Sequence, residues 1–198
     1  MIRRRLVLLA LAWGAVAVAA GALVYGMGPA PSGTEGGGAI GGPFTLRAAG
    51  GRTLTDEDFR GAPFAIFFGY TRCPDVCPTT LADLDVARDE LGAAGDALKV
   101  VFVSVDYERD DPDGLQDFVG SFAHPVIGLT GSREEIEAIA AAYRVHYEKV
   151  PGEGGDYTVN HTAAVYLMDG EGRFTGTIGY GEAQDSALAK LRRLIEAG

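Results

Sequence analysis

The fold of this chain is indicated most clearly by the run Phe64-Ala-Ile-Phe-Phe-Gly-Tyr70, which is followed by Thr71-Arg-Cys73-Pro-Asp-Val-Cys77-Pro78. Its first part is a continuous apolar run, which is typical of a central strand covered on both faces. Its second part holds both cysteines of the sequence, with three residues between them. The two thiols therefore lie at a strand-to-helix turn, where they can form a disulfide or bind one soft metal ion as thiolates.

A helix is predicted directly after the second cysteine. Leu81, Leu84 and Leu91 lie between acidic residues and predict an amphipathic helix over residues 78–91. Pro78 suits the first helical position, because its missing N–H needs no partner there. Cys77 is therefore expected at the helix N-terminus, where the partial positive charge lowers the pKa of a thiol.

The chain from residue 43 onward shows alternating strand and helix signals. Val100-Val-Phe-Val-Ser-Val105 is a second continuous apolar run and predicts a second central strand. Two hairpins are predicted at residues 44–46 with 52–54 and at 162–168 with 174–180, and three further helices at 113–122, 132–143 and 185–197. This order predicts an α/β fold: a thioredoxin-like sandwich with a central sheet, an N-terminal hairpin and an inserted β-hairpin.

Residues 6–27 predict a transmembrane helix that precedes this domain. The segment holds no charged side chain and is long enough to cross a bilayer of roughly 30 Å. Three arginines at 3–5 favour a cytoplasmic N-terminus. In a bacterium this predicts a single-pass protein of the inner (plasma) membrane with its domain in the periplasm. A cleaved signal peptide is the alternative, because Ala17-Val-Ala19 has the small residues of a cleavage site.

The composition divides the chain into three parts. Residues 1–27 are the predicted membrane anchor or signal segment. Residues 28–42 are rich in Gly, Pro, Ser and Thr, which predicts a flexible linker. Residues 43–198 have the usual length of one domain with its own core.

Charge and compartment narrow the possible partners. Asp and Glu outnumber Lys and Arg by 27 to 17, for a formal charge of -10, and the basic residues form no stripe that follows phosphates, so nucleic acid is not an expected partner. Both the anchor and the signal peptide export the domain to an oxidising compartment, where adjacent thiols are driven to a disulfide. A periplasmic thiol reductant is therefore an expected partner.

The two cysteines suit either a redox disulfide or a metal site. Thioredoxin-type enzymes usually have two residues between their cysteines, whereas Cys73 and Cys77 have three, which favours disulfide exchange less. Two thiolates and one neutral imidazole suit a soft ion such as Cu(I). His161, next to the predicted strand 162–168, is the candidate third ligand, although a lone histidine is more often a structural residue. Both interpretations stay open on spacing alone.

Other residues of metal-binding type have less support. Asp106, after the second central strand, is either a hydrogen-bond partner of the site or a turn former. His124 and His146 have no ligand-like neighbours at short spacing and are expected to be structural. Met168 lies in an apolar strand and is expected in the core.

Four stretches of the sequence resemble the Sco/SenC family of copper-binding proteins. The most specific is Phe67-Phe-Gly-Tyr-Thr-Arg-Cys-Pro-Asp-Val-Cys-Pro-Thr-Thr-Leu81. The others are Gly41-Gly-Pro-Phe-Thr-Leu46, Val103-Ser-Val-Asp106 with Glu108-Arg-Asp110, and Asn160-His-Thr-Ala-Ala-Val-Tyr-Leu-Met-Asp169. The resemblance covers about residues 41 to 180.

The resemblance implies a membrane-anchored metallochaperone rather than an enzyme. It implies that Cys73, Cys77 and His161 bind one copper ion, as Cu(I), Cu(II) or both, for delivery to the binuclear copper centre of cytochrome c oxidase. The copper-accepting subunit of that oxidase is then the expected partner. The family often has Asp before the histidine, whereas this chain has Asn160. Asn160 is therefore expected beside the ligands, without contacting the metal itself, and the absence of a carboxylate there is expected to change the affinity for Cu(II) more than for Cu(I).

Two other functions remain as alternatives. In the first, Cys73 and Cys77 form a redox disulfide of a thiol-disulfide oxidoreductase that reduces the copper-ligating cysteines of the oxidase. Such enzymes resemble one another in a cis-proline at the place where this chain has Asn160-His161-Thr162, which favours metal binding. In the second, the disulfide is structural, which is disfavoured because so short a loop constrains the unfolded chain little.

Overall fold

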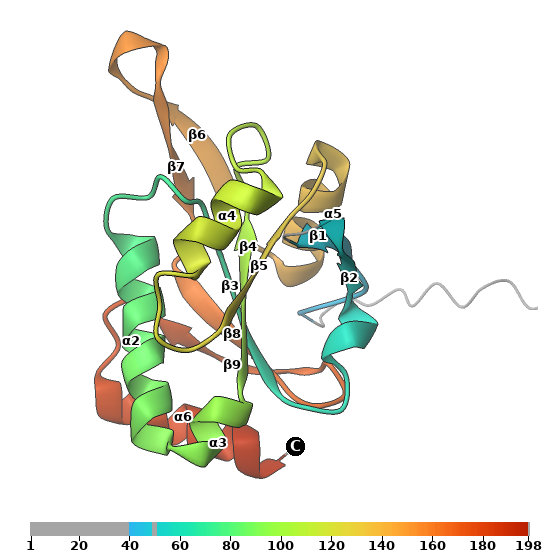
Figure 1. Ribbon diagram of the computed structural model, residues 1–198, viewed down its shortest axis with the longest axis vertical. Coiled ribbons are helices and arrows are strands. Elements are labelled where there is room, and N and C mark those ends of the chain that lie inside the picture. The colour runs from blue at the N-terminus through green and yellow to red at the C-terminus, as the bar shows by residue number, and fades with distance from the viewer. Residues whose placement is uncertain (1–39, 49–50, 198) are drawn as a thin grey trace, which may run out of the picture. The chain divides into compact units, whose positions relative to one another are not determined.

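The computed structural model describes residues 40–48 and 51–197 (Figure 1). The predicted membrane segment 6–27, and residues 28–39 of the predicted linker, lie outside these ranges. Within the described ranges, no helix has both the length and the apolar character that a membrane span requires.

Seven strands form one mixed sheet in the order β2-β1-β5-β4-β3-β8-β9. Its centre is parallel and consists of β3 (Phe64–Gly69), β4 (Lys99–Ser104) and β5 (Val126–Thr130). The flanking strands are antiparallel to their neighbours: β1 (Thr45–Ala48), β2 (Thr53–Thr55), β8 (Ala164–Met168) and β9 (Phe174–Gly179). Every residue of β3 is buried, as its apolar run predicts.

Helices cover both faces of this sheet (Figure 1). One face is covered by α2 (Val76–Leu91), α4 (Pro112–Val119) and α6 (Gln184–Ala197), and the other by α5 (Arg133–Tyr143). The aromatic core shows the two layers. Phe102 of β4 lies 5.3 Å from the Phe118 ring of α4, whereas Phe68 of β3 lies 5.4 Å from the Tyr143 ring of α5. The arrangement is the predicted mixed α/β, thioredoxin-like fold with a central sheet.

Several predicted elements are confirmed, although some of their boundaries differ from the prediction. The hairpins β1–β2 and β8–β9 form as predicted. The capping box of α5 is present, with the Ser132 hydroxyl accepting from the Glu135 amide and the Glu135 carboxylate accepting from the Ser132 amide. The helix predicted to end at residue 122 ends at Val119, and the Ser121 hydroxyl then donates to the Phe118 carbonyl.

The sequence pattern does not predict a second, two-stranded sheet. β6 (Tyr147–Pro151) and β7 (Tyr157–His161) pair antiparallel, and this hairpin projects from the seven-stranded sheet (Figure 1). The prediction that a strand begins at residue 162, directly after His161, is therefore wrong. His161 ends β7, and the strand of the main sheet begins at Ala164. Three short elements complete the fold: η2 (Asp56–Phe59), α3 (Ala93–Ala97) and η3 (Glu153–Gly155).

Candidate metal centre

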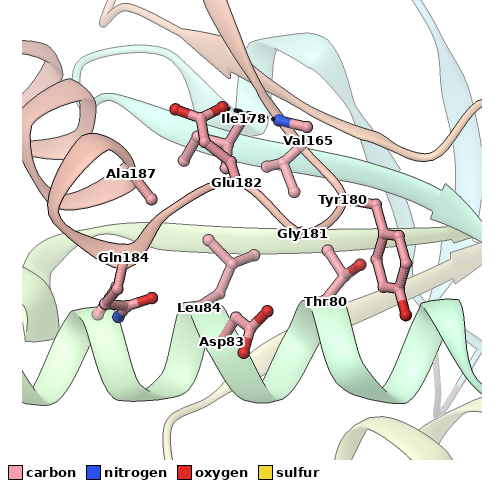
Figure 2. Close-up of a pocket in the computed structure, with 12 residues that line it drawn as sticks. Thr80, Asp83, Leu84, Val165, Ile178, Tyr180, Gly181, Glu182, Gln184 and Ala187 are labelled. Atoms are coloured by element: carbon pink, nitrogen blue, oxygen red, sulfur yellow. Dashed lines mark hydrogen bonds between the residues drawn. The ribbon is translucent and has the colours of Figure 1, made fainter.

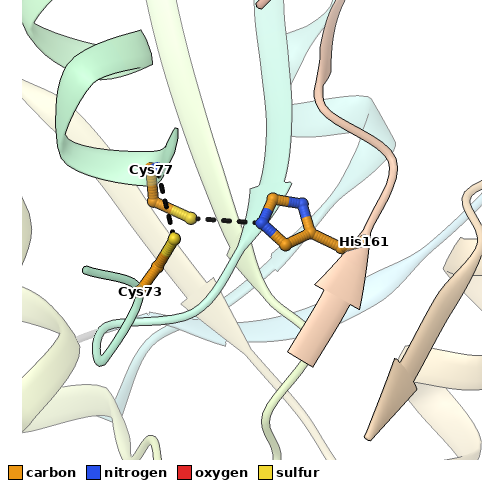
Figure 3. A group of neighbouring side chains, drawn as sticks. All are labelled: Cys73, Cys77 and His161. Atoms are coloured by element: carbon orange, nitrogen blue, oxygen red, sulfur yellow. Dashed lines mark hydrogen bonds between the residues drawn. The ribbon is translucent and has the colours of Figure 1, made fainter. Parts of the chain in front are cut away.

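Cys73, Cys77 and His161 converge at one end of the central strands (Figure 3). Their sulfur and nitrogen atoms all lie within 4.8 Å of one another. The Cys77 sulfur is 3.4 Å from Nε2 of His161. The Cys73 sulfur accepts a hydrogen bond from the Cys77 backbone N–H at 3.4 Å. Residues 84 positions apart in the chain thus present three donor atoms to one point.

The cysteines are held by the turn between β3 and α2. The helix begins at Val76 instead of Pro78, so Cys77 and Pro78 both lie in its first turn. The backbone amides of a first turn have no partner within the helix. The Cys77 amide is one of them, and it is free to donate to the Cys73 sulfur. Proline is tolerated at this position for the same reason.

Gly69, the last residue of β3, makes room for the second cysteine. A Cβ atom at this position would lie 2.6 Å from the Cys77 sulfur and 2.7 Å from the Phe102 ring. No side chain fits there without displacing one of them. Sequence reasoning did not single out Gly69, although glycine inside a strand often marks a close approach of another group.

The two thiols differ in exposure. Cys77 is fully buried, whereas Cys73 is half-buried. Burial raises the pKa of the Cys77 thiol far above its ordinary value, because the thiolate loses its hydration. The prediction that the helix N-terminus lowers the pKa of this thiol is therefore wrong, since desolvation outweighs the helix dipole. A metal ion bound at this position would supply the missing stabilisation, since a thiol that coordinates a metal ion is deprotonated.

His161 is oriented so that Nε2 faces the cysteines. Its Nδ1 lies 3.2 Å from the Thr162 carbonyl, which assigns the proton to Nδ1 and leaves a lone pair on Nε2. The rings of Phe67 and Tyr70 stand edge-on to the imidazole at 5.9 and 6.0 Å. Burial lowers the pKa of His161, so the imidazole is neutral at neutral pH. A neutral imidazole is the form that binds metal ions.

Asp106 and Asn160, the two residues expected beside the three donors, differ in burial. Asp106 is fully buried, and its carboxylate accepts from the Tyr157 hydroxyl and from Nε of Arg109. Asn160 is exposed beside the centre. An open groove of about 310 Å³ leads to the centre from solvent, and it is lined by Tyr70, Cys73, Asp75, Thr158, Asn160 and His161, among others.

Neither of the other two histidines belongs to the three-donor group among the described residues, and Met168 lies in a strand of the main sheet. His124 Nδ1 is 2.9 Å from the Asp85 carboxylate, which also accepts the His124 backbone N–H, so His124 ties α2 to the segment before β5. His146 is exposed and lies 4.0 Å from Glu148. Met168 is fully buried in the core, as its strand predicts.

A cavity between α2, β9 and α6 is too small to hold a substrate (Figure 2). It measures about 20 Å³, enough for one water molecule. Thr80 Oγ1 and Gln184 Nε2 line it, and neither has a hydrogen-bond partner among the described residues. None of the residues that line it belongs to the Cys–His centre.

Comparisons with known proteins match this chain to one family. The model of the SCO1/SenC family matches residues 32–196. The human protein SCO1 homolog, mitochondrial, is 37% identical over 155 residues, which make up 77% of this chain and 52% of the relative. The chain spans about half the length of the curated relatives that it matches first.

Two solved structures of copper-bound proteins share the fold over the described domain. The structure of Bradyrhizobium japonicum ScoI with copper bound has 43% sequence identity and a TM-score of 0.72, and covers 79% of this chain and 99% of its own. The structure of Arabidopsis thaliana ScoI with copper bound has 40% identity and a TM-score of 0.75, and covers 81% of this chain and 100% of its own.

Proposed function

The chain belongs to the SCO1/SenC family, and from this premise we propose that it binds one copper ion through Cys73, Cys77 and His161 and delivers it to the binuclear copper centre of cytochrome c oxidase. The convergence of two sulfurs and one imidazole nitrogen within 4.8 Å carries this proposal. In this proposal copper is a cargo that the chain binds and releases, and the chain makes or breaks no covalent bond of another molecule.

The donor set suits copper. Thiolate and imidazole ligands select soft and borderline ions, whereas Mg²⁺ and Ca²⁺ require oxygen ligands. The lone pair of His161 Nε2 points toward the Cys77 sulfur, and the imidazole is neutral. Three donors leave a coordination position open for a ligand of the acceptor. The site therefore fits an ion that is held and then passed on.

The exposure of the ligands sets an order for the handover. Cys73 is half-buried and lines the open groove, whereas Cys77 is fully buried. A thiolate or imidazole of the acceptor enters through this groove and first replaces Cys73. The copper ion then leaves Cys77 and His161 by further ligand exchange, without a change in its oxidation state. The acceptor is the copper-accepting subunit of the oxidase, and residues 6–27 anchor the chain in the inner membrane beside it.

A competition titration tests this function. The full chain, kept in a non-ionic detergent and reduced under anaerobic conditions, is titrated with Cu(I) against a chelator. We expect one tightly bound copper per chain in the wild type and weaker binding in Cys73→Ser, Cys77→Ser and His161→Ala. An unchanged Cu(I) affinity in His161→Ala overturns the three-ligand site.

A thiol-disulfide oxidoreductase is the second candidate, because the two sulfurs are close and Cys73 is accessible. Cys73 would attack a disulfide of the oxidase, Cys77 would displace the reduced product, and a periplasmic thiol reductant would return two electrons. The raised pKa of Cys77 opposes the second step. Disulfide exchange that is fast and indifferent to His161→Ala, together with weak copper binding, would favour this candidate.

A further inference from the structure

The loop between β4 and α4, residues 105–111, holds two neighbouring residues that contact opposite halves of the metal centre. Asp110 contacts the segment that carries the cysteines, and Arg109 contacts the hairpin that carries His161. Both backbone amides donate to the Asp106 carbonyl, at 3.1 Å from Arg109 and 2.9 Å from Asp110. The two residues are thereby fixed relative to each other, and we call residues 105–111 the positioning loop.

Asp110 holds the cysteine side of the centre. Its carboxylate accepts from the Thr71 backbone N–H at 2.8 Å and from the Thr71 hydroxyl at 2.7 Å. It also accepts from the Ser104 hydroxyl at 2.6 Å, and only 6% of the residue is exposed. Thr71 lies two residues before Cys73. The buried carboxylate therefore fixes the start of the turn from which the Cys73 thiol extends.

Arg109 holds the histidine side of the centre. Its Nη1 donates to the Tyr157 carbonyl at 2.9 Å and to the Asp156 carboxylate at 2.8 Å. Its guanidinium carbon lies 3.5 Å from the centre of the Tyr157 ring, a cation–π contact. Its Nε donates to Asp106, which also accepts from the Tyr157 hydroxyl at 2.6 Å. Tyr157 begins β7 and His161 ends it, so this cluster holds the strand that presents the imidazole.

The hairpin needs this attachment because its strands do not join the seven-stranded sheet. Hydrogen bonds from Gly152 N to Asp156 O and from Thr162 N to His146 O mark the two ends of its ladder. The alternation of an antiparallel ladder then directs the Tyr157 carbonyl away from β6. Arg109 donates to this outward-facing carbonyl. Its guanidinium thus takes the place of a neighbouring strand that could otherwise bond to the carbonyl.

We propose that Arg109 and Asp110 are positioning residues that set the distance between the two cysteines and His161, with Asp106 orienting Arg109. The inference rests on the proposed three-ligand copper site. Hydrogen bonds that orient metal ligands commonly change metal affinity by about tenfold or more. Arg109 acts through His161, and Asp110 acts through Cys73. A lysine at position 109 cannot replace the arginine, because it lacks the planar fork that reaches Asp106 and Tyr157 together.

A double-mutant cycle separates the effect of Arg109, through His161, from the effect of Asp110, through Cys73. Cu(I) affinity is measured for the full chain in detergent, with Arg109→Gln, Asp110→Asn, His161→Ala and the pairs Arg109→Gln/His161→Ala and Asp110→Asn/His161→Ala. We expect Arg109→Gln to weaken binding by about tenfold, and to cause no further loss once His161 is absent. Asp110→Asn weakens binding in both backgrounds. Arg173→Gln is the matched control, because Arg173 makes a similar Nε contact with Asp169, at 2.8 Å, in the β8–β9 turn.

Hydrogen exchange of the metal-free chain gives a readout that does not depend on copper. In Arg109→Gln, the amides of residues 157–161 exchange faster, while those of β3 and β4 keep their wild-type rates. Tyr157→Phe removes only the hydroxyl bond to Asp106 and gives the same pattern to a smaller degree. Faster exchange throughout the domain, or full additivity of Arg109→Gln with His161→Ala, overturns the proposal. If His161→Ala leaves Cu(I) affinity unchanged, the three-ligand function fails, and the exchange of residues 157–161 still decides whether Arg109 positions the hairpin.

Discussion

The two halves of the candidate metal centre are built by different means. The cysteine half is part of the core: β3 is buried along its whole length, Cys77 is fully buried, and Gly69 leaves room for its sulfur. The histidine half is a two-stranded hairpin, and Val159 is the one residue of its two strands that is buried. Packing fixes the first half, and a loop with Asp106, Arg109 and Asp110 joins the second to it.

Because of this difference, substitutions in the two halves should affect the free energy of unfolding and copper binding to different degrees. A change in the cysteine half disturbs the packing that stabilises the whole domain, and therefore alters the free energy of unfolding and copper binding together. A change in the hairpin moves His161 and leaves most of the core intact. Substitutions on the two sides test this distinction.

Gly69→Ala should have the largest effect. The added Cβ meets the Cys77 sulfur at 2.6 Å and the Phe102 ring at 2.7 Å, and such overpacking costs typically about 1–3 kcal/mol. We expect a lower free energy of unfolding in urea and a loss of tight Cu(I) binding. Gly179→Ala on β9 is the control, because no atom lies within 4 Å of its added Cβ. Wild-type stability and affinity in Gly69→Ala would contradict the role of core packing in the cysteine half.

Val159→Ala should affect binding more than stability. Val159 is 5% exposed and is the apolar anchor of β7, and the removal of two buried methyl groups costs about 1–2 kcal/mol, here chiefly in local opening of the hairpin. We expect faster hydrogen exchange in residues 157–161 and weaker Cu(I) binding. Val150→Ala on β6 is the matched control, since Val150 is 36% exposed. Equal effects of the two substitutions would mean that burial of Val159 does not hold the hairpin.

Asn160→Asp tests the charge beside the histidine. Asn160 is exposed next to the groove, so a new carboxylate interacts with the ion through solvent, and the change in affinity should stay below about tenfold. We expect tighter Cu(II) binding and a smaller change for Cu(I), with a weaker effect at high salt. Titrations of both oxidation states at two ionic strengths measure it. An equal gain for Cu(I) and Cu(II) would refute the electrostatic explanation.

Glu182→Gln should have the smallest effect, because Glu182 lies between β9 and α6, outside both the hairpin and the metal centre. Lys190 and the Ser186 hydroxyl lower the pKa of Glu182 to about 2. Because the folded pKa lies below the unfolded value of about 4.3, the contact stabilises the fold above pH 4.3 and is lost as the pH falls toward 2. A partly exposed pair contributes at most about 1 kcal/mol. Urea unfolding between pH 6 and 2.5 should show a shallower loss of stability in Glu182→Gln, with hairpin exchange unchanged at pH 6.

The cysteine half could be predicted from the sequence, whereas the hairpin that carries His161 could not. The apolar run of β3 and the leucines of α2 predict the strand, the turn and the helix, which fix both thiols. The hairpin lacks such a run. Tyr157, Val159 and His161 alternate with exposed residues over five positions, a weak strand signal. The contacts that hold it join Asp106 and Tyr157 across 51 positions, and sequence spacing says nothing about such pairs.

Two further differences have physical reasons of the same kind. The strand β5 was not predicted, because Val126-Ile-Gly-Leu-Thr130 is a short run interrupted by glycine. The direction of the Cys77 pKa shift was wrong, because a helix N-terminus is visible in the sequence and the depth of burial is not. In both cases tertiary packing outweighs the local pattern.

X-ray absorption at the copper edge of the Cu(I)-loaded chain shows whether the two cysteines of the core and the histidine of the hairpin bind the same ion. We expect two sulfur neighbours and one nitrogen neighbour per copper in the wild type, and the loss of the nitrogen neighbour in His161→Ala. A copper ion with sulfur neighbours alone, unchanged by His161→Ala, would contradict the claim.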